Sequence, residues 1–162
     1  MRRIRYSVAM SLDGYIAGPN GGYGWIEMDP SSGAEYFKAF YAQFDTAVTV
    51  LGGDALKRVA ALREEPGREI WLWGGGETLG GLAEASLVDT VEVGVIPVLL
   101  GAGRKVMTGC SRRVKLVQRP TELQLPGHTL LVYDVEKRRR ELGSRGRIRT
   151  SDQRINSPSL YH

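Results

Sequence analysis

The 162-residue sequence contains one cysteine, Cys110, and only two histidines, His128 and His162. A single thiol cannot form an intramolecular disulfide, and so few cysteines and histidines cannot supply the ligands of a structural zinc site. No apolar run reaches the roughly 18 residues that a membrane-spanning helix needs. The N-terminus is basic but lacks the apolar segment of a signal peptide. These absences favour a cytoplasmic protein with no metal site and no disulfide.

Two catalytic motifs are also missing. No Gly-x-Ser-x-Gly sequence occurs, which removes the usual support for a serine nucleophile. The run of three glycines at residues 74–76 is not followed by Gly-Lys-Ser/Thr, which excludes a Walker nucleotide site. Cys110 has no histidine near it in sequence and is interpreted as a thiol without a catalytic role.

Positive charge is concentrated at the C-terminal end. Residues 137–162 contain eight Lys/Arg and two acidic residues, whereas residues 1–136 contain fourteen Lys/Arg and sixteen acidic residues. The tail has few large apolar side chains to offset the entropy of ordering, which predicts disorder. A nucleic-acid interface over residues 137–154 would lack interleaved aromatic residues, which disfavours that partner. The sequence predicts one domain over residues 1–136 and a basic, disordered tail over residues 137–162.

Apolar periodicity predicts alternating strands and helices. Strands are expected over residues 4–10, 46–51, 70–73, 90–100, 114–119 and 129–135, and helices over 33–44, 55–65 and 77–85. This alternation is typical of a three-layer α/β fold with a mixed, mostly parallel sheet. We expect the strand at 70–73 to be central and the strand at 90–100 to lie beside it. Pro97 is expected to interrupt that second strand.

Three local patterns refine this prediction. Ser32 and Glu35 fit a capping box at the start of the first helix. That helix carries an aromatic stripe, which we interpret as core rather than as a ligand face; its members are Tyr36, Phe37, Phe40, Tyr41 and Phe44. Residues 126–128, Pro-Gly-His, are expected to form the turn between the last two strands.

The strand at 70–73 runs directly into three glycines and a helix that begins near Glu77. Glycines let a phosphate approach the backbone, and a helix N-terminus offers unpaired N–H groups with a partial positive charge. This order indicates a pyrophosphate site, although tight strand-to-helix turns also need glycine for steric reasons. A branched residue at Gly75 is expected to obstruct pyrophosphate and to strain the turn through a positive φ.

Asp13 follows the first strand and opens a loop over residues 13–25 that contains five glycines. A carboxylate in this position can accept hydrogen bonds from the amino edge of a pyrimidine. It can equally cap the turn, and taken alone that second role is the commoner one.

These motifs resemble the RibD C-terminal family of dihydrofolate reductase-like proteins. The resemblance rests on residues 69–77, Glu-Ile-Trp-Leu-Trp-Gly-Gly-Gly-Glu, and residues 87–103, Leu-Val-Asp-Thr-Val-Glu-Val-Gly-Val-Ile-Pro-Val-Leu-Leu-Gly-Ala-Gly. It covers most of residues 1–135. The family implies a homodimeric, NADPH-dependent reductase of the riboflavin-biosynthesis, 5-amino-6-(5-phosphoribosylamino)uracil reductase-like type, which transfers hydride to a pterin- or pyrimidine-like substrate.

The resemblance also implies roles for individual residues. The NADPH pyrophosphate would contact the residues of the glycine turn, which are Gly74, Gly75, Gly76 and Glu77. The nicotinamide would be bordered by Ala9, Ile16 and Gly18. The substrate would face Asp13, the candidate catalytic carboxylate, and Trp25.

The sequence departs from the family after Val48. Family members continue from this strand into a Gly-Arg-Lys/Arg-Thr-Tyr motif, a helix, another strand and a Ser-Arg pair, whereas here residues 49–55 follow at once and match only the sequence beyond that stretch. The chain therefore looks internally deleted, without the arginine and threonine that contact cofactor phosphates. Two interpretations follow. The protein is a reductase with weakened NADPH binding, or it is a truncated, non-catalytic homologue. Such a homologue would either persist as a folded dimer or be a fragment produced by gene prediction.

Overall fold

The computed structural model describes residues 1–26, 34–49, 52–120, 124–125 and 127–137. Strands and helices alternate along this part of the chain. In order they are β1 (Ile4–Ser11), β2 (Tyr15–Ala17), α1 (Ala34–Tyr41), β3 (Phe44–Val48), α2 (Ala55–Glu64), β4 (Glu69–Leu72), α3 (Gly76–Glu84), β5 (Thr90–Ile96), β6 (Arg104–Lys105), β7 (Leu116–Gln118), β8 (Gln124–Leu125) and β9 (His128–Val135).

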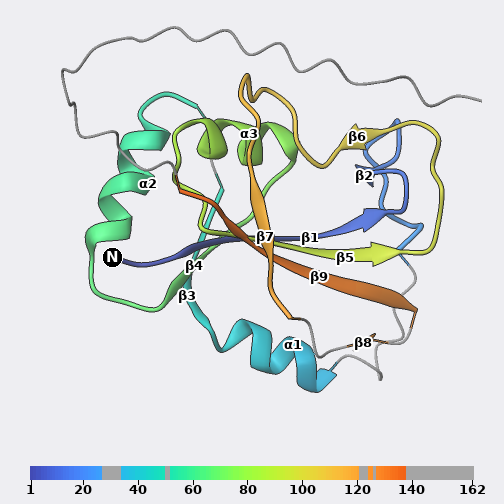
Figure 1. Cartoon of the computed structure of the whole chain (residues 1–162), viewed down its shortest axis with the longest axis horizontal. Coiled ribbons are helices and arrows are strands. Elements are labelled where there is room, and N and C mark those ends of the chain that lie inside the picture. The colour runs from blue at the N-terminus through green and yellow to red at the C-terminus, as the bar shows by residue number, and fades with distance from the viewer. Residues whose placement is uncertain (27–33, 50–51, 121–123, 126, 138–162) are drawn as a thin grey trace, which may run out of the picture.

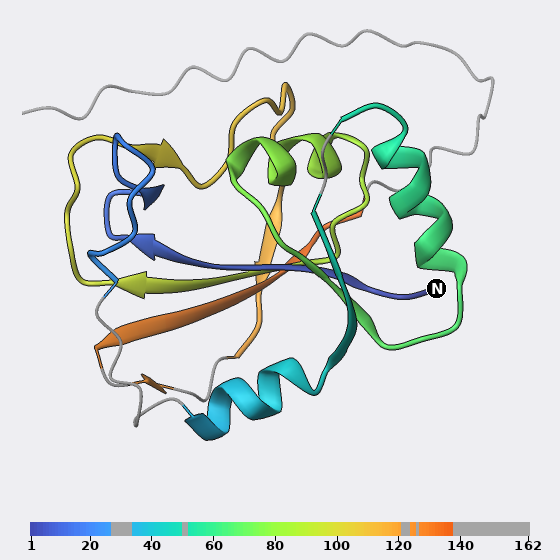
Figure 2. The same ribbon diagram turned by 180° about the vertical axis from the view of Figure 1, so that it is seen from behind.

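A seven-stranded sheet forms the middle layer, in the order β3-β4-β1-β5-β9-β7, with β8 paired to β9. The four strands β3, β4, β1 and β5 are parallel, and β9 runs antiparallel to β5. Helix α1 covers one face, and α2 and α3 cover the other, as seen in Figure 1 and from behind in Figure 2. This arrangement confirms the predicted three-layer α/β fold with a mixed, mostly parallel sheet.

The order of the strands differs from the prediction, because β1 separates β4 from β5. Strand β1 pairs in parallel with both of them, so the expected contact between the strands at 70–73 and 90–100 is wrong. On the polar face of β1, Arg5 is buried. Arg5 on that face lies between two acidic residues, Glu69 of β4 and Glu92 of β5, at 2.6 and 3.4 Å. These ion pairs allow a charged side chain to occupy the centre of the sheet.

Three predicted boundaries are corrected by the structure. Helix α1 ends at Tyr41, and Phe44 instead begins β3, where it pairs with Glu69 of β4. Strand β5 ends at Ile96, so Pro97 follows the strand rather than interrupting it. His128 is the first residue of β9 and not part of the preceding turn. The capping residue Ser32, residues 50–51 and the tail beyond Lys137 lie outside the described residues.

The glycine-rich loop after β1 also contains an unpredicted strand. Strand β2 pairs antiparallel with the two-residue β6 and forms a second, small sheet with it. Gly103, with a φ of +149°, lies against this loop, and a Cβ there would come within 2.1 Å of the Ala17 carbonyl oxygen. The loop is therefore anchored to the segment that follows β5.

The main apolar core lies between the sheet and the layer of α2 and α3. Its fully or almost fully buried members include Ile4, Tyr6, Ile70, Leu72 and Leu82. Burial raises the pKa of the Tyr6 phenol to about 12, since the charged form would lose its hydration. The other face of the sheet is more polar, and it carries the candidate site.

Candidate active site

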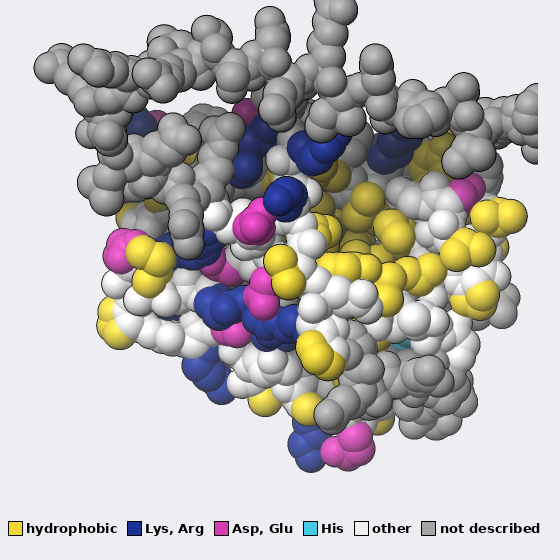
Figure 3. Space-filling view, in the orientation of Figure 1, with side chains coloured by type: hydrophobic (Ala, Val, Ile, Leu, Met, Phe, Trp, Pro, Cys, Tyr) yellow, Lys and Arg dark blue, Asp and Glu magenta, His cyan; other side chains and the backbone are white. Residues whose placement is uncertain are grey.

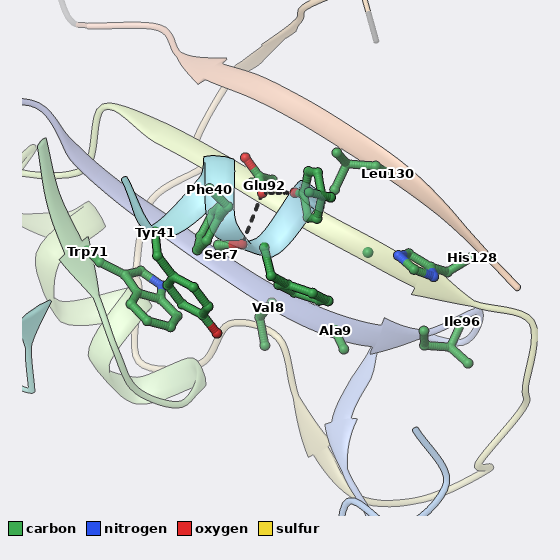
Figure 4. Close-up of a pocket in the computed structure, with 13 residues that line it drawn as sticks. Ser7, Val8, Ala9, Phe40, Tyr41, Trp71, Glu92, Ile96, His128 and Leu130 are labelled. Carbon is green, nitrogen blue, oxygen red and sulfur yellow. Dashed lines mark hydrogen bonds between the residues drawn. The ribbon is translucent and has the colours of Figure 1, made fainter. Parts of the chain in front are cut away.

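An open pocket with a volume of about 160 Å³ lies between α1 and the sheet. Helix α1 forms one wall, and strands β1, β4, β5 and β9 form the floor (Figure 4). The lining residues are Ser7, Val8, Ala9, Tyr36, Phe37, Phe40, Tyr41, Trp71, Glu92, Gly94, Ile96, His128 and Leu130. The pocket therefore combines flat aromatic surfaces with a small number of polar groups, as is usual for small-molecule sites.

The aromatic stripe of α1 forms much of this pocket. Tyr36, Phe37, Phe40 and Tyr41 all line it, and only Phe40 among these four is buried. Phe40 meets Trp71 edge to face, with ring centroids 5.5 Å apart, which links the helix to β4. The interpretation of the stripe as core is correct for Phe40 and Phe44 and wrong for the other three residues. Periodicity identifies the inward face of a helix but cannot tell a filled core from a pocket.

A buried carboxylate, Glu92, lies at one end of the pocket. Its Oε1 accepts a hydrogen bond from the Tyr36 hydroxyl at 2.8 Å and another from the Ser7 hydroxyl at 3.2 Å. Figure 4 shows both bonds converging on the carboxylate. The Arg5 guanidinium lies 3.4 Å from Oε2 and balances the negative charge. Burial, and then the nearby Glu92 charge, raise the pKa of Tyr36, so this hydroxyl stays protonated as a donor.

Sequence reasoning missed Glu92 as a site residue. It stands between valines in an otherwise apolar strand, and its side chain is only 5% exposed. An isolated acid in a strand that is covered on both faces must find donors, because an unpaired buried charge is strongly destabilising. An isolated acidic residue in an apolar strand was therefore the sequence signal that could have identified Glu92. Its partners, however, come from β1 and α1, and sequence alone does not show that these elements meet at Glu92.

His128 lies at another part of the pocket, beside Ile96 (Figure 4), and Ala9 of β1 lines the same pocket. Its imidazole packs over Gly94: a Cβ built on that glycine would lie 3.5 Å from the His128 Cδ2 atom. An alanine methyl group at position 94 would therefore touch the ring at ordinary van der Waals distance. The sequence placed His128 in a turn without a function, whereas the start of β9 brings it into the site.

The glycine turn lies at the carboxyl end of β4, at the same edge of the sheet as the end of β1. Gly75 is the N-cap of α3, and no side chain caps the helix. Its φ is −88°, so the expected positive φ is wrong and a side chain would not strain the backbone. A Cβ there would have one neighbour, the Ile16 side chain at 4.0 Å. The Gly75 position therefore leaves open space above the helix N-terminus.

The neighbouring glycines serve packing. A Cβ on Gly76 would come within 2.3 Å of the Lys105 carbonyl oxygen, and one on Gly74 within 2.7 Å of the Thr78 hydroxyl. Glu77 is exposed in the first turn of α3. The steric explanation for glycine thus applies to Gly74 and Gly76, while Gly75 is the position that leaves room for a ligand.

Asp13 makes the contacts of a capping residue. Its carboxylate accepts hydrogen bonds from the Ser11 hydroxyl at 2.6 Å and from the backbone N–H groups of Leu100 and Gly101. The Ser11 bond is the main cause that lowers the pKa of this exposed carboxyl, and the two backbone bonds act in the same direction. Asp13 does not line the pocket under α1. The structure therefore gives it the second of the two roles considered for it, which is to hold the turn after β5.

The other predicted residues divide between two places. Ala9 lines the pocket, and Ile16 faces Gly75. Gly18 closes a tight turn by donating its N–H to the Gly22 carbonyl oxygen at 2.8 Å. Trp25 is half-buried, and its indole N–H has no acceptor within the described part of the chain. Neither Gly18 nor Trp25 lines the pocket under α1.

The region of the predicted deletion lies at the free edge of the sheet. Among the described strands, β3 is the outermost and pairs only with β4. Beyond it the chain reaches α2 within a few residues, and an open groove lies between the two elements, lined in part by Ala47, Val48 and Arg58. The sheet thus ends at the position of the predicted deletion.

Two features are not seen among the residues that the structure describes. No group of three or more His, Cys, Asp or Glu side chains is arranged to hold a metal ion. No helix in the same residues has the length and apolar character needed to cross a membrane.

Comparison with known proteins gives the family of the chain. The family model of the RibD C-terminal domain matches residues 34–132. The Bacillus subtilis protein YyaP, an uncharacterized protein, is 24% identical over an alignment of 177 residues that covers 82% of this chain and 94% of YyaP. This alignment is longer than the 162-residue chain itself, so YyaP has residues within it that this chain lacks.

Two solved structures show the same fold at low identity. The diaminohydroxyphosphoribosylaminopyrimidine deaminase/5-amino-6-(5-phosphoribosylamino)uracil reductase of Thermotoga maritima matches with a TM-score of 0.60 and 13% identity, over 83% of this chain and 56% of that protein. Dihydrofolate reductase from Enterococcus faecalis, solved with NADP(H), matches with a TM-score of 0.51 and 12% identity, over 83% of this chain and 97% of that protein. The chain therefore belongs to the RibD C-terminal domain family and has a dihydrofolate reductase-like fold.

Proposed function

We propose that this protein is an NADPH-dependent reductase of the riboflavin-biosynthesis type, which transfers hydride to a pyrimidine- or pterin-like substrate. One observation carries the proposal: the pocket under α1 and the open N-terminus of α3 lie around the carboxyl ends of β1 and β4. In open α/β sheets, ligands bind at the carboxyl ends of the strands. A substrate in the pocket and a cofactor at α3 would therefore meet near Ala9.

The residues at α3 fit a dinucleotide in part. Gly75 leaves space above the helix N-terminus, where the unpaired N–H groups of the first turn favour an anion. Ile16 would border the cofactor on the side that faces Gly75. A bound nicotinamide dinucleotide supplies the hydride, and the protein supplies orientation and exclusion of water.

The pocket fits a flat heterocycle that carries N–H donors. Phe37, Phe40 and Tyr41 offer aromatic surface for stacking. The Glu92 carboxylate and the Tyr36 oxygen at one end are acceptors for an amino or ring N–H group. Glu92 thereby takes the recognition role that the sequence had suggested for Asp13. The Thermotoga maritima relative is named for a reductase of such a pyrimidine, which supports this substrate class for the present chain.

We also propose that the protein forms a homodimer. Hydrophobic side chains gather around a hollow on the face that Figure 3 shows, and the groove there is lined by residues including Leu79, Met107, Leu116 and Tyr133. On the adjoining strand β7, Leu116 is 43% exposed and Val117 is 56% exposed. Exposed apolar surface beside an edge strand is typical of an interface between subunits. Sedimentation of a monomer at micromolar concentration would contradict this assembly.

The second candidate is a truncated homologue without catalytic activity. Two observations favour it. The edge of β3 is open, and YyaP has residues within the alignment that have no counterpart in this chain. Loss of charge-assisted phosphate contacts, each worth about 1.5–3 kcal/mol, would weaken NADPH binding by orders of magnitude.

Single-turnover hydride transfer separates the two candidates. The purified 162-residue protein is mixed with NADPH labelled with deuterium at the transferred position, together with a panel of pyrimidine and pterin compounds. Deuterium found in the reduced product supports the reductase. Complete absence of label transfer at saturating NADPH, with the fold intact by circular dichroism, supports the non-catalytic homologue.

A further inference from the structure

We infer that His128 is the proton donor that completes the reduction of a substrate bound in the pocket under α1. This inference rests on the reductase function proposed above. Reduction of a C=N bond needs both a hydride and a proton, and the hydride source supplies no proton. The pocket must therefore supply one or admit water.

His128 is the side chain in the pocket that is suited to this task. The other titratable groups lining the pocket are Glu92, Tyr36 and Tyr41. Glu92 accepts two hydroxyl hydrogen bonds and faces the Arg5 cation, so it is held as a carboxylate acceptor. The raised pKa of Tyr36 makes it a poor acid. An imidazole is the side chain whose ordinary pKa lies closest to neutrality.

His128 lines the same pocket in which the proposed hydride transfer would take place. Its ring lies over Gly94, and Gly94 is the register partner of Ala9 across β1 and β5. Ala9 borders the place where cofactor and substrate would meet. Glu92 lies two residues before Gly94 on the same face of β5. A ring anchored at Glu92 would thus extend along β5 towards His128.

The chemical step balances as follows. Hydride forms a C–H bond at the carbon of the substrate C=N, and the π electron pair moves to the nitrogen. That nitrogen forms an N–H bond with the proton of the His128 imidazolium. The imidazole becomes neutral and is protonated again from water at the open side of the pocket. The substrate gains two electrons, which come from the nicotinamide dinucleotide.

The first test uses the two histidines of the chain, His128 and His162. Imidazole signals are recorded by NMR while 5,6-diaminouracil is added, and the variant His162→Asn identifies which signal belongs to which residue. We expect the His128 signals to move and the His162 signals to stay. If the probe changes the tryptophan fluorescence of the protein while the His128 signals do not move, the inference is overturned.

The second test measures hydride transfer against pH for wild type, His128→Asn and His128→Gln, with His162→Asn as the matched control. We expect the wild-type rate to fall as pH rises and the imidazolium is lost. Both His128 variants should lose about 100-fold in rate and show no such fall. Equal unfolding midpoints show that they remain folded. A wild-type rate and pH profile in these variants would overturn the proton-donor role and leave the reductase function standing. An inactive wild type would overturn both.

Discussion

The Tyr36 hydroxyl donates a 2.8 Å hydrogen bond to the buried Glu92 carboxylate and thereby joins α1 to the centre of the sheet. Helix α1 has only eight residues, which is too short for stability on its own. Its aromatic contacts and this bond therefore hold it over the pocket. The same bond determines how much acceptor capacity Glu92 offers to a ligand.

We predict that Tyr36→Phe destabilises the protein by about 1.5–3 kcal/mol, because a buried carboxylate loses a donor. Urea unfolding measures the change. Tyr41→Phe is the matched control, since Tyr41 lines the same pocket but is 52% exposed. That variant should stay within about 0.5 kcal/mol of wild type. Equal effects of the two substitutions would show that the Glu92 bond contributes nothing specific.

We predict that Gly75→Val abolishes dinucleotide binding without unfolding the protein. The Cβ has space and the φ is −88°, so the new side chain occupies the ligand's place rather than straining the turn. Gly81→Val in the same helix is the control, because a Cβ there meets nothing within 4 Å. Titrations are followed by tryptophan fluorescence, with circular dichroism to verify folding.

The same titration tests the predicted deletion. Wild type should bind NADPH only weakly, with a dissociation constant above about 0.1 mM, and with little preference over NADH, because the sequence lacks the phosphate-binding arginine that the family resemblance implies. Binding should weaken further as salt is added, since part of the contact is ionic. Tight binding that is selective for NADPH would contradict the account of the missing segment.

We predict that Gly80→Ala destabilises the protein by about 1–3 kcal/mol through overpacking. A Cβ on Gly80 would come within 1.7 Å of the Thr108 carbonyl oxygen, so α3 and the segment after β6 would have to separate. Gly81→Ala, one residue along the helix, should instead stabilise the protein by up to about 1 kcal/mol. Thermal unfolding of both variants measures the difference, and a common sign would contradict this packing.

We predict that Asp13→Ala increases hydrogen exchange at the Leu100 and Gly101 amides, because both donate to this carboxylate. Asp54→Ala is the control, as its carboxylate is exposed and, within the described part of the chain, pairs with the exposed Lys57 at 3.6 Å. The pKa of Asp13 lies below its usual value of 3.8 in the folded protein. Its stabilising effect is therefore complete above pH 3.8 and is lost as pH falls through the lowered pKa. Unchanged protection in Asp13→Ala would remove the capping role.

Most elements of the fold could be predicted from sequence because their signals are local. The apolar run at 70–73 followed by three glycines predicted β4, the turn and α3. Predicted boundaries were wrong where a tertiary contact overrides local preference. Phe44 continues the helical stripe in sequence, yet it belongs to β3 because its backbone pairs with Glu69.

The candidate site was predicted only in part. Motifs pointed to Ala9, Ile16 and Gly75, which the structure places at the pocket or at the open end of α3. They did not point to Glu92 or His128. These two residues have no neighbouring motif, and their significance depends on strands and a helix that are distant in sequence.

The sequence by itself determined the fold class, the glycine turn and the family resemblance, because each is written in periodicity or in contiguous residues. Only the tertiary structure decided that β1 lies between β4 and β5, and that α1 leaves a pocket over them. The physical reason is that strand order and cavities depend on contacts between distant segments. The Tyr36 to Glu92 bond spans 56 residues, and no local propensity encodes it.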